Sequence, residues 1–261
     1  MPEQLARVIA VANQKGGVGK TTTAINIPTA MALDGHNVLI VDMDPQGNLT
    51  SGVGKKGKRA EEGTVYEALV TDGDPASFIM ATGIDHLWLM PADRQLTGAE
   101  IDLVTMPERE HRLQRVLDPL REEFEYIFID CPPSLGLLTL NALVAADGVV
   151  IPLHCEYFAL EGLADLVGTM RRVRSGLNPT LDIEGVVLTM YDDRTNLGQL
   201  VAREVREFFK DKVFNTVIPR NVKLGEAPSH GMPAVVYDWK SRGAAAYIAL
   251  AKELMERRVN A

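Results

Sequence analysis

Short apolar runs rich in β-branched residues alternate along this chain with stretches that show helical periodicity. Seven runs predict strands, at Val8–Ala12, Val38–Asp42, Leu87–Pro91, Tyr126–Asp130, Val149–Leu153, Gly185–Met190 and Val213–Pro219. The stretches between them predict helices at Lys20–Leu33, Glu108–Glu122, Leu137–Ala145, Leu160–Arg174, Leu197–Lys210 and Ala244–Arg258. Because the strands are apolar along nearly their whole length, we expect a mostly parallel, twisted sheet covered by helices on both faces.

The whole chain, residues 1–261, is expected to form a single α/β domain. It is 46% hydrophobic, which is enough for one large core, and it has no internal repeat and no low-complexity linker. Pro28 falls inside the first predicted helix, where it should remove a hydrogen bond and kink the helix. No apolar run reaches the roughly 18 residues of a membrane span, and a strand begins so early that we expect no signal peptide.

The segment Lys15-Gly-Gly-Val-Gly-Lys-Thr-Thr22 follows the first predicted strand directly. Gly16, Gly17 and Gly19 allow backbone angles closed to other residues, so that successive N–H groups can converge on an anion. Lys20 would open the next helix, whose free amides and dipole favour a phosphate, and the Thr21 hydroxyl could bind Mg²⁺. The alternative is a plain glycine-rich turn, but a strand, this loop and a helix in register predict a nucleotide phosphate site.

Two more predicted strands end in carboxylates, at the edge of the sheet where α/β proteins bind ligands. One runs into Asp42-Met-Asp-Pro-Gln-Gly-Asn48, and the other into Asp130-Cys-Pro-Pro-Ser134. Acids at strand ends are commonly turn-forming residues. Beside a phosphate loop, however, paired carboxylates indicate a cation or a water molecule to be oriented.

The charge distribution is uneven. The net charge is −8, yet residues 191–261 carry 12 Lys and Arg against 9 Asp and Glu, which leaves −11 on the remainder. A polyanion partner is therefore expected only at a local patch. A second basic run, Lys55–Arg59, lies in the segment Ser51–Gly63, for which we predict a mobile, solvated loop with DNA contact as the alternative. Cys131 and Cys155 are expected to be small core residues in a reducing compartment.

The glycine loop resembles the deviant Walker A motif K-G-G-x-G-K-[ST] of the ParA/MinD class of ATPases, with Lys15 as the signature lysine. Asp42–Asn48 is similar to the second acidic motif of that class, and Ile129–Ser134 to its Walker B motif. The segments Glu156–Gly162, Tyr191–Leu197 and Ile218–Gly231 resemble the chromosomal ParA/Soj branch in particular. The resemblance covers nearly the whole chain and implies a P-loop NTPase fold with a sheet of about seven to eight strands.

The resemblance implies a role for each matching residue. The loop residues would bind ATP, namely Lys15, Gly16, Gly17, Val18, Gly19, Lys20, Thr21 and Thr22, while Pro219 and Asn221 would line the adenine pocket. The Mg²⁺ ion would be coordinated by Thr21 and supported by Asp130 through a water molecule. Asp42 would brace the metal side of the site. Asp44 would orient the attacking water, and Lys15 would reach the phosphates of a second subunit. Arg194 and Lys223 would contact DNA.

The function implied is that of a cytoplasmic, nucleoid-associated bacterial ATPase that segregates DNA. ATP would close a sandwich homodimer that binds double-stranded DNA without sequence preference, and a ParB-like centromere-binding partner would stimulate slow hydrolysis to ADP and phosphate. About 14 residues precede Lys15, so an N-terminal helix-turn-helix domain is not expected.

One alternative function is that of a MinD-like ATPase that cycles on membranes through its last helix. However, the mixed charges of Ala244–Ala261 favour a helix packed on the core and no stable membrane association. A nitrogenase-type iron–sulfur reductase is another, although Cys131 is poorly placed for a cluster. A small-molecule ligase or kinase also stays open, although the sequence shows no signature of a substrate pocket.

Overall fold

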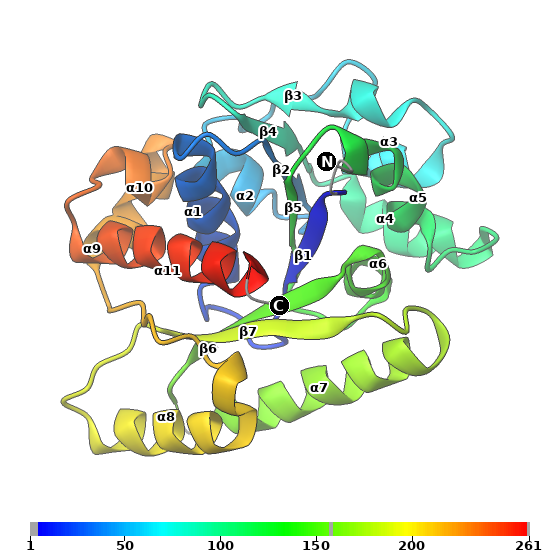
Figure 1. The fold of residues 1–261 in the computed structure, drawn as a ribbon. Helices are drawn as coiled ribbons and strands as arrows, with labels where there is room; N and C mark the ends of the chain where they lie inside the picture. Colours follow the sequence, from blue (N-terminus) through cyan, green and yellow to red (C-terminus); the bar gives the residue numbers. More distant parts are fainter. Residues whose placement is uncertain (1–4, 157–158, 260–261) are drawn as a thin grey trace.

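The computed structural model describes residues 5–156 and 159–259. Its centre is a seven-stranded sheet in the order β3-β4-β2-β5-β1-β6-β7 (Figure 1). The strands are β1 (Arg7–Val11), β2 (Val38–Asp42), β3 (Met80–Ala81), β4 (Leu87–Met90), β5 (Tyr126–Asp130), β6 (Gly148–His154) and β7 (Asp182–Thr189). All neighbouring pairs are parallel except β3 with β4. The predicted α/β class and mostly parallel sheet are confirmed.

Helices cover both faces of this sheet (Figure 1). On one face lie α1 (Lys20–Leu33), α2 (Asn48–Gly52), α10 (Ala234–Tyr237) and α11 (Arg242–Val259). On the other lie α3 (Val65–Val70), α4 (Leu96–Asp102), α5 (Arg112–Leu117), α6 (Leu137–Ala145), α7 (Ala159–Gly176) and α8 (Asn196–Phe209). A short helix, α9 (Val222–Glu226), leads through a 3₁₀ turn, η5 (Ala227–His230), to α10. Each sheet face therefore buries its own apolar cluster, as the continuous apolar strands require.

Six of the seven predicted strands are present, and the seventh, Val213–Pro219, is wrong. This segment pairs with the end of the sheet only at isolated bridges, Val213 with Val186 and Pro219 with Tyr191. Between them the amides of Asn215 and Thr216 donate to the Glu253 carboxylate, at 2.7 and 2.9 Å. The Phe214 and Ile218 amides still donate to the Val186 and Leu188 carbonyls of β7, at 2.9 and 2.8 Å, but the Glu253 side chain of α11 accepts from two amides between them, and no continuous strand forms.

The predicted helix Glu108–Glu122 is too long. The α-helix occupies only Arg112–Leu117 and is followed by a separate 3₁₀ turn, η3 (Pro119–Glu122). Glu108 has a φ of 50°, outside the helical region, and Pro119 has no N–H for an α-helical bond. By contrast, α1 continues as one helix across Pro28. The Thr29 hydroxyl donates to the Ile25 carbonyl at 2.7 Å, in the turn that contains the proline.

The predictions for the two cysteines are confirmed in respect of burial, since Cys131 and Cys155 are both buried and free. The last helix also packs on the core as expected, with Tyr247, Leu250 and Leu254 almost fully buried. Among the described helices, none combines the length and the apolar character that a membrane span requires. The apolar stripe of α11 therefore faces the core of the protein.

Candidate functional site

The glycine loop lies between the central strand β1 and the first turn of α1. Gly17 and Gly19 have φ values of 74° and 89°, in the left-handed region where glycine carries no steric cost. The space where a side chain on Gly16 or Gly17 would lie is open, with no described atom within 4 Å. Gly19 is the N-cap of α1 and supplies no side-chain cap, so the first amides of the helix stay available to a ligand. The loop has the geometry of an anion cradle.

Lys20 is the cation at the centre of this cradle. Its side chain is largely buried, and its Nζ donates to the Lys15 carbonyl oxygen at 2.9 Å. Burial lowers the pKa of Lys20, while the nearby carboxylates of Asp130 and Asp44 act in the opposite direction. A buried ammonium group between an anion cradle and two carboxylates is suited to neutralise a phosphate.

Asp42 and Asp130 end neighbouring strands and are direct partners in the β2–β5 register. Asp42 is fully buried and already engaged. Its Oδ2 accepts from the Thr50 amide at 2.8 Å and the Thr50 hydroxyl at 2.7 Å, and its Oδ1 accepts from the Asp44 amide at 3.2 Å. Burial raises the pKa of Asp42 to about 6 against these hydrogen bonds. Asp42 therefore holds the turn that carries Asp44, whatever else it binds.

Asp130 is as fully buried as Asp42, but its hydrogen bonding is different. Among the described residues, neither of its carboxylate oxygens has a hydrogen-bond partner that meets ordinary geometry. Burial and the adjacent Asp42 charge raise the pKa of Asp130 well above its usual range, with Thr21 and Lys20 acting against them. A buried carboxylate left without partners is costly unless a cation or an ordered water completes it.

The donor set around Asp130 fits magnesium. It offers carboxylate and hydroxyl oxygens, the hard ligands that Mg²⁺ takes, and the ion needs few protein ligands when phosphates and waters supply the rest. No group of three or more acidic, histidine or cysteine side chains arranged for a metal is found in residues 5–156 and 159–259. The structure therefore suits an ion that arrives with a nucleotide rather than one held in a dedicated protein cage.

The glycine loop, Lys20 and Asp44 border a cleft of about 630 Å³, which neither Asp42 nor Asp130 lines. Of the predicted site residues it is lined by Gly16, Gly17, Gly19, Lys20, Thr21, Thr22, Asp44 and Asn221. Asp44 is 8% exposed, and its Oδ1 accepts from the Gln46 amide at 2.9 Å, which fixes the carboxylate at the cleft wall. The structure thus brings the loop, one acid of the second motif and the distant Asn221 together.

The other predicted nucleotide residues lie close by but do not line the cleft. Val18 is buried, and its carbonyl accepts from the Thr189 hydroxyl at 2.7 Å. Pro219 bridges to Tyr191, while its neighbours Ile218 and Arg220 face the cleft instead. The segment Glu156–Gly162 includes Tyr157 and Phe158, which lie outside the described residues.

Several lining residues had not been predicted. They are Gln46, Asn48, Pro133, Thr189, Met190, Ile218, Arg220, Leu224, Gly225 and Tyr247. Met190 has a φ of 48°, which is uncommon for a residue other than glycine and is often found at functional sites. Arg220 lies between the predicted residues Pro219 and Asn221 in the sequence, and this position could have indicated that it lines the cleft. The sequence could not indicate that Tyr247 lines the cleft, because its position depends on how α11 packs against α1.

Lys15 does not point its ammonium group into the cleft. Its Nζ forms an ion pair with Glu156, and Glu156 also pairs with His154 at 2.7 Å. Both members of the Lys15–Glu156 pair are partly exposed, so the pair is worth at most about 1 kcal/mol. A weak pair of this kind can be exchanged for a stronger partner.

Arg194 and Lys223 are at the surface, as expected of residues that contact a macromolecule. The Arg194 side chain is 86% exposed and forms two hydrogen bonds to Asp192, at 2.8 and 2.7 Å, which lower the pKa of Asp192 to about 2. Lys223 pairs with Glu226 at 2.7 Å, and its Nζ lies 5.6 Å from the centre of the Tyr237 ring. Both cations are therefore restrained locally rather than free in solvent.

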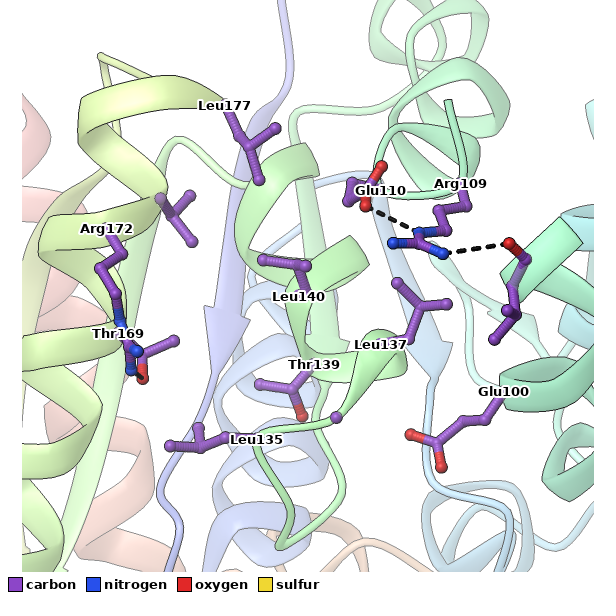
Figure 2. A pocket seen from close by; sticks show the side chains of 13 residues that line it. Glu100, Arg109, Glu110, Leu135, Leu137, Thr139, Leu140, Thr169, Arg172 and Leu177 are labelled. Atoms are coloured by element: carbon purple, nitrogen blue, oxygen red, sulfur yellow. Dashed lines mark hydrogen bonds and ion pairs between the residues drawn. The ribbon is translucent and has the colours of Figure 1, made fainter. Parts of the chain in front are cut away.

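A larger pocket, of about 700 Å³, lies away from this chemistry between α4, α6 and α7 (Figure 2). Leu135, Leu137 and Leu140 form much of its wall. The Arg109 side chain at its rim is already bound to Glu110 and to the Val104 carbonyl. None of the predicted site residues lines this pocket, so its size does not make it the functional site.

Comparisons with known proteins agree with this geometry. The family model of the AAA domain matches residues 6–183. The chain is 56% identical to the sporulation initiation inhibitor protein Soj of Bacillus subtilis, covering 96% of this chain and 98% of that protein. It is 53% identical to the chromosome partitioning protein ParA of Myxococcus xanthus, covering 97% and 89%.

One of the similar solved structures contains a bound nucleotide analogue. Cobyrinic acid a,c-diamide synthase from Mycobacterium smegmatis, determined with an ATP analogue and magnesium, superposes with a TM-score of 0.82 at 38% identity, covering 96% of this chain and 95% of that one. Coverage of nearly the full length at such identity shows the family. The chain belongs to the ParA/Soj family of chromosome-partitioning ATPases, which the glycine loop and the acids at the ends of β2 and β5 had indicated.

Proposed function

We propose that this protein is a DNA-segregation switch that binds ATP and Mg²⁺ in the cleft between the glycine loop and Asn221. ATP would close a homodimer, the dimer would bind DNA without sequence preference, and hydrolysis would release it. The observation that supports this most strongly is Asp130, a buried carboxylate with no hydrogen-bond partner among the described residues, beside Lys20 and an open glycine cradle. The names of the Soj and ParA relatives support the cellular role.

Within the cleft we assign each residue by its position. The amides of the loop and Lys20 would hold the phosphates, and Asn221, which lines the same cleft, would contact the base. Thr21 would bind magnesium directly and Asp130 through water, and the bound ion would offset phosphate charge. Asp44 lies at the cleft wall, where it can orient a water molecule. The predicted role of Asp42 beside the metal becomes, on its hydrogen bonds, chiefly that of positioning Asp44.

The experiment that tests this function compares ligands rather than residues. Purified protein with Mg²⁺ and either ATP, ADP or no nucleotide is passed over a random-sequence DNA duplex and, separately, mixed with liposomes for flotation. DNA binding that occurs with ATP, but not with ADP or without nucleotide, supports the proposal. Flotation with ATP and no DNA binding would support a MinD-like membrane cycle instead, although the buried face of α11 argues against that outcome.

The partner and the cellular location follow from the same proposal. A ParB-like protein that binds centromere sites would stimulate hydrolysis, and the ATP form would lie on the nucleoid in the cytoplasm. A fluorescent fusion should therefore colocalise with DNA. Co-purification with the product of a neighbouring ParB-like gene, together with a rise in ATP turnover when DNA and that protein are added, would identify the activator.

The predicted action of Lys15 in trans leads to a specific expectation. Lys15→Ala should leave ATP binding by the monomer almost unchanged, because only the weak pair with Glu156 is lost. ATP-dependent dimerisation and hydrolysis should fall, because the ammonium group would be missing from the partner's phosphates. Calorimetry of ATP binding and light scattering with ATP measure the two effects separately.

Mixed dimers provide the control for that prediction. A Lys15→Ala subunit paired with a Lys20→Ala subunit has one nucleotide-competent site, and that site faces an intact Lys15. If Lys15 acts in trans, such mixtures recover part of the ATPase activity that each variant lacks alone. Mixtures as inactive as the separate variants would place Lys15 in its own subunit's site.

The proposed DNA contacts are tested by replacing Arg194 and Lys223 with alanine. Affinity for DNA should become less dependent on salt, with the log–log slope falling by up to about 1 for each lost phosphate contact. ATP binding and dimerisation should persist, because neither residue lines the cleft. Anisotropy titrations over a salt series measure the slope. A charge-matched variant, Arg171→Ala with Lys252→Ala, removes two exposed cations elsewhere, and an equal change in both variants would contradict the assignment.

A further inference from the structure

The basic run between α2 and α3 forms a loop held at both ends. We call residues Gly54–Arg59 the lysine loop. At its start, Gly54 has a φ of 76°, and a side chain placed on it would come within 2.9 Å of the Gly231 carbonyl oxygen. At its end, Arg59 pairs with Glu67 and, at 3.3 Å, with Asp93. The charge run is thus anchored to the fold rather than hanging in solvent.

Between these anchors the chain makes a tight turn that displays its lysines. The Lys58 amide donates to the Lys55 carbonyl at 2.9 Å, and Gly57 takes a φ of 70°. Lys56 and Lys58 are exposed and Lys55 is half-buried. None of the three forms an ion pair with a residue in the described part of the chain. The acids that follow are Glu61 and Glu62, which are also exposed.

The lysine loop adjoins the segment that carries Lys223. The Lys223 ammonium lies 5.6 Å from the centre of the Tyr237 ring, and His230 stacks on the same ring at 5.0 Å with 17° between the planes. His230 precedes Gly231, and Gly231 faces Gly54. Because both glycines have positive φ and no side chain, the two backbones can approach closely. One short run of contacts therefore joins the proposed DNA residue to the lysines.

The same loop is tied to the nucleotide site. The Lys55 amide donates to the Thr50 carbonyl at 3.0 Å, and Thr50 in turn donates twice to Asp42. The Thr50 hydroxyl also accepts from the Ala92 amide at 3.0 Å. Hydrogen bonds that begin at the end of β2 thus fix where the lysines stand relative to the ATP cleft.

We propose that Lys55, Lys56 and Lys58 form a second group of DNA-backbone contacts, continuous with the surface that carries Lys223. The proposal rests on the proposed function, because it extends the DNA surface of the same ATP dimer. Lysine presents a flexible point charge that suits phosphates and carries no base readout. Two subunits would add six such charges, which matters in a chain whose net charge is −8.

The test is the variant Lys55→Ala/Lys56→Ala/Lys58→Ala, titrated with a random-sequence duplex in Mg²⁺ and a non-hydrolysable ATP analogue from 50 to 200 mM salt. The log–log slope should fall by up to about 5, with roughly 0.9 for each lost contact in the dimer. The control Arg171→Ala/Arg172→Ala/Lys252→Ala removes three exposed cations from α7 and α11. A slope change in the lysine-loop variant no greater than in this control would overturn the proposal.

A second variant separates geometry from charge. Gly54→Ala keeps every lysine but forces a side chain against the Gly231 carbonyl, so DNA affinity should fall while ATP binding persists. If that variant does not fold, as a melting curve would show, the three alanine substitutions in the lysine loop still decide the matter. A wild-type protein that binds no DNA with ATP would overturn the proposed function together with this extension. Wild-type binding with an unaltered lysine-loop variant would overturn the extension alone.

Discussion

Replacing Lys20 with alanine should abolish ATP binding. The substitution removes the buried ammonium group of the cradle while the loop amides stay in place, and truncating one member of a buried, hydrogen-bonded charge pair costs about 2–5 kcal/mol. ATP affinity should therefore fall at least about 30-fold. The carboxylates of Asp44 and Asp130 would add to the loss, because they would face the phosphates without a cation between them. Calorimetric titration with Mg²⁺ and ATP measures the effect.

The matched control is Lys252→Ala, which removes an exposed lysine of α11. Melting curves for both variants show whether the fold survives, since Lys20 also donates to the Lys15 carbonyl. Lys20→Ala protein that folds and binds ATP within a few-fold of wild type would remove the glycine loop from the nucleotide site.

Replacing Asp44 with alanine should have the opposite pattern, with ATP bound and hydrolysis stopped. Asp44 lines the cleft but is not part of the phosphate cradle, so binding should persist. Loss of a positioned acid–base or water-orienting group typically costs about 10²–10⁴ in rate. The variant should therefore accumulate as an ATP-bound dimer. Single-turnover hydrolysis and light scattering measure the rate and the dimer.

Asparagine at position 44 separates chemistry from structure. Asp44 Oδ1 accepts from the Gln46 amide, and the amide oxygen of Asp44→Asn can keep that hydrogen bond while the charge is lost. If both variants stop hydrolysis, the charge is responsible rather than the shape of the turn. Turnover near the wild-type rate in either variant would assign the water to another residue.

The strands could be predicted because each central strand is buried on both faces and so must be apolar throughout. β3 could not, since two residues carry no pattern. The failure at Val213–Pro219 has a different cause. Its apolar content is right for a strand, but Glu253, about forty residues further on, accepts from two amides in the middle of the segment. Local pattern cannot show where a distant carboxylate will lie.

The candidate site divides in the same way. Residues within one motif, such as Lys20 and Thr21, could be placed because the loop and helix follow directly from the sequence. Contacts between separate motifs could not be predicted from the sequence. The bonding of Asp42 to Thr50, the pair between Lys15 and Glu156, and the place of Arg220 in the cleft depend on how separate elements meet. The predicted roles of these residues therefore needed the structure before they could be argued physically.

The contact between the two ends of the chain has a consequence for biosynthesis. The Thr23 hydroxyl, in the helix that begins at the phosphate loop, lies 3.0 Å from the hydroxyl of Tyr247, which also lines the cleft. These residues are 224 positions apart. At about 5–20 residues per second, the ribosome needs roughly ten to forty-five seconds to pass from one to the other. The nucleotide site is thus begun first and completed last, so a nascent chain lacks a finished ATP cleft until α11 has emerged.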